Sequence, residues 1–148
     1  MYKMYKVSLM SHSDFQEAYE IEKQTNLSPW SKENFFSSYE VGHKSLVCKI
    51  NNKIIGFIIF SVVKKEAHLL NIAVQAEHQN KGVGSLLMDS MLKQASVMGA
   101  SKIYLEVRSK NEKAILFYRK YKFAQDAIRI NYYIGKNPDD AILMSLAI

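Results

Sequence analysis

The stretch AHLLNIAVQAEHQNKGVGSLL, residues 67–87, joins a strand pattern to a helix pattern through a glycine-containing turn. Residues 67–74 form a largely apolar run, which predicts a long strand. From Val83 onward, apolar residues recur every three or four positions, as is typical of a helix, and Gly99 stands where its C-terminal cap belongs. The turn between them is Gln79-Asn80-Lys81-Gly82-Val83-Gly84. This order of strand, turn and helix predicts a site at the start of the helix.

The turn has the properties of an anion-binding loop. The first N–H groups of a helix have no internal partner, and the helix dipole places a partial positive charge beside them. Gly82 and Gly84 permit a close backbone approach, and Lys81 adds a full charge, so the loop predicts contacts to phosphate oxygens. It is neither a Walker loop nor the three-glycine dinucleotide fingerprint. Two glycines alone also fit an ordinary turn.

Periodicity and turn residues predict the other elements. Before this stretch we expect a strand over 5–10, a helix with a capping box at Ser13–Gln16, a helix capped by Ser31, and strands over 45–50 and 54–63 joined by a hairpin. After it we expect a strand over 101–107, a helix over 112–121, and strands over 123–131 and 141–146. The order β-α-α-β-β-β-α-β-α-β-β predicts an α/β (α+β) fold, with a mixed, largely antiparallel central sheet flanked by helices.

Composition limits the class of protein. The 148 residues are 48% hydrophobic and contain no linker-like stretch, so we expect one domain over 1–148. No apolar run reaches the roughly 18 residues of a membrane span, and a single cysteine, Cys48, excludes an internal disulfide framework. These features predict a cytoplasmic protein without membrane contact. The net charge of +6 comes mostly from scattered lysines, which suits a solvated surface, a polyanionic ligand or nearby RNA.

Several blocks together resemble the GNAT superfamily of acetyltransferases. Their order and spacing cover nearly the whole chain, and more narrowly they are similar to the RimI-type ribosomal-protein alanine N-acetyltransferases. The blocks are Pro29-Trp30-Ser31, Asn71-Ile72-Ala73-Val74, Gln79 to Leu87, Leu105-Glu106-Val107-Arg108, Asn111, Ala114-Ile115-x-x-Tyr118, Asn131-Tyr132-Tyr133, and Asp140-Ala141-Ile142-x-Met144. The resemblance implies the GNAT fold, acetyl-CoA as cosubstrate and no metal.

The resemblance also implies roles for individual residues. Glu106 would be the general base and Tyr118 the general acid. A protein's N-terminal side chains would contact aromatic residues of the flanking segments, Trp30, Tyr132 and Tyr133. Acetyl-CoA would be held by backbone or side-chain groups of Ile72, Ala73, Val74, Gln79, Asn80, Lys81, Gly82, Val83, Gly84, Ser85 and Asn111. The superfamily consensus has arginine where this chain has Gln79, a change that is common in the RimI-type group.

These residue types suit acetyl transfer. The reaction needs a neutral amine and a protonated leaving thiolate. An α-amine has a pKa near ~8, against ~10.4 for lysine, so part of it is neutral at physiological pH. A carboxylate such as Glu106 can remove the remaining proton, and a phenol such as Tyr118 can protonate the thiolate. Without the resemblance, Glu106 also fits a solvated strand face, and Tyr118 and the three aromatic residues also fit a core.

Three functions remain open at this stage. The resemblance favours acetylation of a protein N-terminus, most specifically the N-terminal alanine of small-subunit ribosomal protein eighteen. The second function is acetylation of another protein or a small-molecule amine, because a fold does not determine its substrate. The third is a basic RNA- or ribosome-binding module, but no recognised RNA motif or clustered arginine-aromatic face is present, so we expect no direct nucleic-acid contact. His12, His43, His68 and His78 lack metal-ligand spacing.

Overall fold

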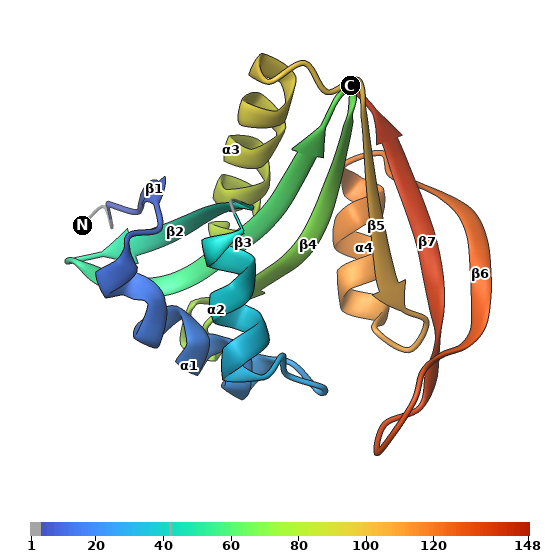
Figure 1. Ribbon diagram of the computed structural model, residues 1–148, viewed down its shortest axis with the longest axis horizontal. Coiled ribbons are helices and arrows are strands. Elements are labelled where there is room, and N and C mark those ends of the chain that lie inside the picture. The colour runs from blue at the N-terminus through green and yellow to red at the C-terminus, as the bar shows by residue number, and fades with distance from the viewer. Residues whose placement is uncertain (1–3, 42) are drawn as a thin grey trace.

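The described residues, 4–41 and 43–148 of a computed structural model, form a seven-stranded sheet with helices on both faces (Figure 1). The elements in chain order are β1 (Lys6–Leu9), η1 (His12–Asp14), α1 (Phe15–Thr25), α2 (Lys32–Glu40), β2 (Lys44–Ile50), β3 (Lys53–Val63), β4 (Glu66–Val74), η2 (Ala76–His78), α3 (Val83–Val97), β5 (Lys102–Arg108), α4 (Glu112–Lys120), β6 (Ala124–Tyr133) and β7 (Asp139–Ala147). Apart from the short 3-10 turns η1 and η2, this order confirms the predicted one.

The strands lie in the order β1-β2-β3-β4-β5-β7-β6, and every neighbouring pair is antiparallel except β4 and β5. The hairpin between β2 and β3 turns at Asn51 and Asn52, whose φ angles are 51° and 63°. Both values lie in the left-handed region that asparagine tolerates and that two-residue hairpins need. The largely antiparallel sheet and the hairpin therefore agree with the sequence prediction.

Two cores lie on opposite faces of the sheet. On one face, α3 and α4 pack against the strands through buried residues that include Leu87, Met91 and Ile115. On the other face, α1 and α2 pack through residues that include Ile21 and Phe35. Figure 1 shows α1 and α2 in front of the sheet and α3 and α4 behind it. Cys48 is buried in the first core, as expected for a structural cysteine.

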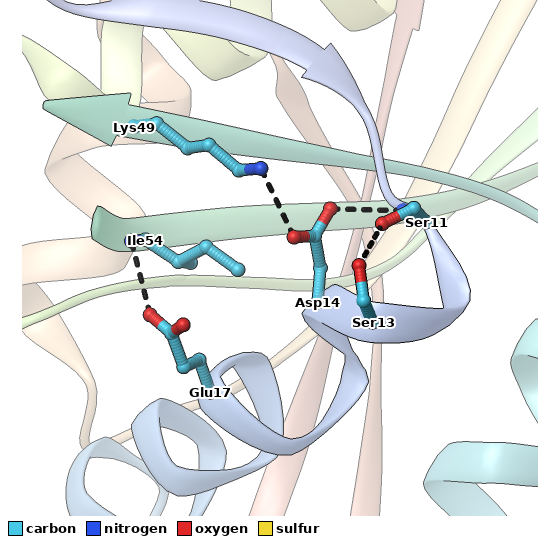
Figure 2. A network of polar contacts seen from close by, with 6 residues as sticks. All are labelled: Ser11, Ser13, Asp14, Glu17, Lys49 and Ile54. Atoms are coloured by element: carbon cyan, nitrogen blue, oxygen red, sulfur yellow. Dashed lines mark hydrogen bonds and ion pairs between the residues drawn. The ribbon is translucent and has the colours of Figure 1, made fainter. Parts of the chain in front are cut away.

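The start of α1 differs from the prediction. The expected capping box at Ser13–Gln16 is replaced by a contact two residues earlier, in which the Ser11 N–H donates to Asp14 Oδ2 at 2.9 Å. Lys49 of β2 reaches the other oxygen of Asp14 at 3.0 Å, and the Ile54 N–H of β3 donates to Glu17 at 3.3 Å (Figure 2). The helical segment therefore begins with the 3-10 turn η1, capped by the Ser11–Asp14 contact, and Asp14 also joins it to the β2–β3 hairpin. Ser31 caps α2 as predicted, accepting from the Asn34 N–H.

Candidate active site

The central feature of the site is a separation of the two parallel strands. β4 and β5 are paired only at Glu66, Ala67 and His68, opposite residues 102–104. On the other side of β4, Ile59 pairs with Asn71 and Phe60 with Leu69, so Leu70 is an extra residue in a β-bulge. Bulges bend a strand and interrupt its pairing. Beyond this bulge the strands diverge, as Figure 1 shows.

A cleft of about 790 Å³ occupies this opening. Its wall includes β4 from Leu69 to Val74 and β5 from Leu105 to Arg108. Residues from both faces of the sheet contribute. Trp30 lies on one side, in the connection between α1 and α2 (residues 26–31, the α1–α2 segment), and Gly84 of α3 lies on the other. The cleft can therefore receive two ligands from opposite faces of the sheet.

The start of α3 has the geometry of an anion site. Asn80 and Gly82 have φ angles of 61° and 86°, and the Leu86 N–H makes a hydrogen bond of 3.0 Å to the Gly82 carbonyl. In an α-helix that bond is the first of the i to i−4 series, so the N–H groups of residues 83–85 have no intrahelical acceptor. Gly82 is suited to its left-handed conformation because it lacks a Cβ. The turn and the helix dipole together favour a phosphate group here.

The predicted cofactor residues are placed unequally. Ile72, Ala73, Val74, Gln79, Asn80, Gly82, Gly84, Ser85 and Asn111 line the cleft. Lys81 is exposed and lies outside the cleft lining, while the Val83 side chain is buried in the core against β3, which leaves only its backbone near the turn. Within the predicted loop, the side chains of Lys81 and Val83 are thus the ones that do not face the cleft.

Two of these residues already have partners within the protein. The Gln79 side chain donates to the Val74 carbonyl at 2.9 Å and accepts from Lys113 Nζ at 3.1 Å. The Asn111 side chain accepts from the Ala114 N–H at 3.2 Å and so caps α4. Gln79 thus joins the end of β4 to α4 and holds Lys113, a cation that the sequence analysis did not single out, beside the anion-binding turn.

The two candidate catalytic side chains have different environments. Glu106 is exposed on β5 and lines the cleft. Tyr118 lies on α4, is only 7% exposed and also lines the cleft. Burial, with a smaller contribution from nearby Tyr133, raises the pKa of Tyr118 far above its ordinary value. The phenol therefore stays protonated over the physiological range and can act as a proton donor.

The aromatic residues expected to contact an acceptor are only partly brought together. Trp30 and Tyr133 are half-buried and line the cleft, whereas Tyr132 is 45% exposed and lies outside its lining. Burial raises the pKa of the Tyr133 phenol, the positive charge of Arg108 opposes this shift, and the negative charge of Glu106 adds to it. Tyr133 and the candidate base Glu106 line the same cleft.

Arg108 is a cleft residue to which the sequence analysis assigned no role. Its guanidinium lies over the Tyr133 ring, 4.2 Å from the ring centroid, and donates to Ser28 Oγ at 2.6 Å and to the Asn137 carbonyl. Asn137 also donates to the Leu27 carbonyl at 3.4 Å. Arg108 thereby joins the α1–α2 segment to the loop between β6 and β7. The long separation of these residues in sequence left no local signal for the contact.

Residues 4–41 and 43–148 hold no group of three or more His, Cys, Asp or Glu placed to bind a metal ion. Within the same ranges, no helix is long and apolar enough to cross a membrane. The lining of the cleft offers a carboxylate, a protonated phenol, backbone donors and the Lys113 ammonium group.

Comparison with known proteins agrees with this geometry. The model of the acetyltransferase (GNAT) family matches residues 12–123. The ribosomal protein bS18-alanine N-acetyltransferase of Salmonella typhimurium is 34% identical over 146 residues, which cover 98% of this chain and 99% of the relative. The crystal structure of the ribosomal-protein-S18-alanine N-acetyltransferase from Escherichia coli superposes with a TM-score of 0.91 at 34% identity, covering 98% of this chain and 94% of that one.

The structure of Ard1 from Thermoplasma volcanium superposes with a TM-score of 0.89 at 27% identity, covering 97% of each chain. The family model spans well over half of the sequence, and the Salmonella relative exceeds 30% identity across nearly its full length. The chain therefore belongs to the GNAT family of acetyltransferases.

Proposed function

We propose that this protein transfers an acetyl group from acetyl-CoA to the α-amine of a protein N-terminus, specifically the N-terminal alanine of ribosomal protein bS18. The observation that carries the proposal is the cleft between β4 and β5, which has an anion-binding helix start on one face and the α1–α2 segment on the other. The names and high coverage of the Salmonella and Escherichia coli relatives support the choice of acceptor. We also propose that the protein acts in the cytoplasm, and that residues 1–148 act as one domain.

The donor would occupy the side of the cleft next to α3. Its pyrophosphate would accept from the free N–H groups at residues 83–85, with Lys113 supplying positive charge. The Gln75 N–H donates to the Ile55 carbonyl of β3, so strand alternation turns the backbone groups of Ile72 and Val74 toward the cleft. Because the Val74 carbonyl accepts from Gln79, Ile72 is the residue best placed to pair with the amide-containing arm of the donor.

Acetyl-CoA supplies the reactive thioester carbonyl, and two side chains of this chain would move the protons. Glu106 would take a proton from the α-ammonium, directly or through water, so that the amine nitrogen can attack the carbonyl carbon. The new C–N bond forms as the C–S bond breaks, and Tyr118 would give its proton to the departing thiolate. The acylated nitrogen still carries the second proton of the amine, which would pass through water to the Tyr118 phenolate, and Glu106 would release the first proton to solvent.

The acceptor would enter from the face of α1 and α2. Trp30 and Tyr133 line that part of the cleft, and Arg108 holds the two loops that border it. Leu27, in the same border, is 69% exposed and offers an apolar contact to a peptide side chain. Tyr132 would be an outer contact for the acceptor, because its ring lies 5.1 Å from that of Tyr133, centroid to centroid.

A peptide panel tests the proposal. The purified protein is incubated with acetyl-CoA and with three matched peptides: one with a free N-terminal alanine and blocked lysines, one with a blocked N-terminus and free lysines, and one with N-terminal proline. Mass spectrometry then identifies the acetylated atom. We expect the product to carry the acetyl group on the alanine α-amine only. Acetylation confined to lysine, or acetylation of spermidine but of none of the peptides when spermidine is added as a fourth acceptor, would replace this proposal with another acceptor class.

A further inference from the structure

Glu22, near the end of α1, is a buried carboxylate outside the groups that the proposed chemistry uses. The residue is 0% exposed and belongs to the wall of the cleft. Among the described residues, no Lys, Arg or His nitrogen lies within ion-pair distance of it. Burying a carboxylate without a cation is costly unless hydrogen bonds replace its hydration. The hydrogen bonds that the Glu22 carboxylate accepts must therefore offset the cost of its burial.

Three donors satisfy this carboxylate, and they come from two separate segments. Glu22 Oε2 accepts from the Trp30 N–H at 2.9 Å and from Asn26 Nδ2 at 3.0 Å, both in the α1–α2 segment. Glu22 Oε1 accepts from Asn71 Nδ2 of β4 at 3.0 Å. One carboxylate thus connects the segment that carries Trp30 to the strand that lines the cleft.

The bulge in β4 makes this connection possible. Leu70 packs in the core next to α1, while Ile72 packs in the core next to α3. In a regular strand, Leu70 rather than Asn71 would pair with Ile59, and alternation would turn Asn71 toward α3. With the bulge, Asn71 faces α1 and reaches Glu22. The β-bulge at Leu70, beyond which β4 and β5 diverge, therefore also lets β4 form a hydrogen bond to α1.

We propose that Glu22 is a positioning residue for the acceptor half of the active site. Its carboxylate fixes Trp30 and the α1–α2 segment against β4, and so sets the distance between the acceptor amine and the acetyl carbonyl. The effect on acceptor binding rests on the proposed function, whereas the effect on the position of Trp30 does not. Reaction rates are sensitive to such placement, because a shift of about 1 Å can cost roughly 100-fold.

Two substitutions separate hydrogen bonding from charge. Glu22→Leu keeps a similar volume but removes all three acceptors. Glu22→Gln removes the charge but keeps an acceptor for Trp30, and rotation of the Asn71 amide can supply the complementary partner for its new N–H₂ group. We expect Glu22→Leu to raise the KM for the acceptor peptide by about 10-fold or more. Glu22→Gln should stay near wild type, and the KM for acetyl-CoA should change less than about twofold in both, because the α3 side is untouched.

A spectroscopic measurement tests the same idea without any acceptor. Trp30 is the chain's single tryptophan, so its fluorescence reports the position of the α1–α2 segment. We expect emission to shift to longer wavelength in Glu22→Leu and not in Glu22→Gln. Glu20→Leu is the matched control, because Glu20 lies on the same helix with 44% of its side chain exposed and contacts only surface groups.

Several outcomes would overturn the proposal. They are unchanged emission with an unchanged acceptor KM in Glu22→Leu, equal rises in the KM values of both substrates, or equal effects of Glu22→Leu and Glu20→Leu. If Glu22→Leu does not fold, Asn71→Ala removes the β4 contact from the other side and must give the same results. An inert wild-type enzyme with the expected fluorescence changes would refute the proposed acceptor and support the positioning role.

Discussion

Gly56 of β3 is the position at which a change in packing should most directly alter the proposed acetyl-CoA site. A Cβ at this position would lie 3.0 Å from the Ala73 carbonyl oxygen of β4 and 3.2 Å from Leu87 Cδ1 of α3. The first contact is with backbone, which cannot rotate away, so β4 must move by a few tenths of an ångström in Gly56→Ala. Overpacking of this kind costs about 1–3 kcal/mol. The displacement would push β4 away from β3 and narrow the cleft toward β5.

The expected result has a structural and a functional part. Thermal unfolding should show a Tm lower by about 2–4 °C for each kcal/mol lost. Steady-state kinetics should show a KM for acetyl-CoA raised by about 3- to 10-fold, since Ile72 lies on the strand that moves and the site tolerates little misplacement. The acceptor KM should change less, because the shift of β4 reaches Trp30 only indirectly, through the Asn71–Glu22 contact.

Gly99→Ala is the matched control for this prediction. Gly99 has a φ of 94°, and a Cβ added there would meet no atom within 4 Å, so alanine strains the end of α3 without crowding β4. The strain costs about 1–2 kcal/mol, which gives a comparable loss of Tm. If both variants lose stability equally and neither changes the KM for acetyl-CoA, the position of β4 does not govern donor binding and the reasoning fails.

Three further predictions concern individual side chains. Glu106→Gln should lower kcat by about 10²- to 10⁴-fold at low pH, and kcat should recover partly above the α-amine pKa of ~8. A loss of kcat that is the same at every pH would show that Glu106 is not the base. Tyr118→Phe should lower kcat with the KM for acetyl-CoA nearly unchanged, and the raised pKa of Tyr118 predicts no alkaline loss of wild-type activity from this group up to about pH 10. Burial raises the pKa of Asp14, but hydrogen bonds from Ser11 and Lys49 lower it more, so the folded pKa lies below the unfolded value of ~3.9. The contribution of Asp14 to the free energy of unfolding is therefore complete above pH ~3.9 and is lost as the pH falls through the folded pKa. Asp14→Asn should therefore cost about 1 kcal/mol in chemical denaturation at pH 7, and this cost should shrink as the pH falls below about 3.9.

Local chemistry made the order of elements predictable from sequence. The hairpin at Asn51 and Asn52 and the end of α3 at Gly99 depend on residues that tolerate positive φ, and the structure has positive φ at all three. The helix start at Gly82 follows the same rule. Each of these features is determined within a few residues of chain, so a sequence without its tertiary contacts is sufficient to locate them.

Features that depend on distant contacts were not predictable. The extra residue at Leu70 has no distinctive composition, and its position follows from how β3 and β4 pair. Arg108 contacts Ser28 and Asn137, which are 80 and 29 residues away in sequence. The ion pair between Asp14 and Lys49 likewise joins residues that are far apart in sequence. Such contacts decide which side chains face the cleft, and for this reason Tyr133 and Tyr132 could not be told apart from sequence.

β4 couples the two halves of the site mechanically. Its side chains at Ile72 and Val74 pack toward α3, where the donor would bind, and those at Asn71 and Ala73 lie toward α1, where the acceptor would enter. Strands in a packed core have little freedom to shift without disturbing both faces. A displacement from the α3 side, as in Gly56→Ala, must therefore strain the Glu22–Asn71 contact as well. The effects of Gly56→Ala and Glu22→Leu should consequently be non-additive in the double variant, in contrast to those of Gly99→Ala and Glu22→Leu.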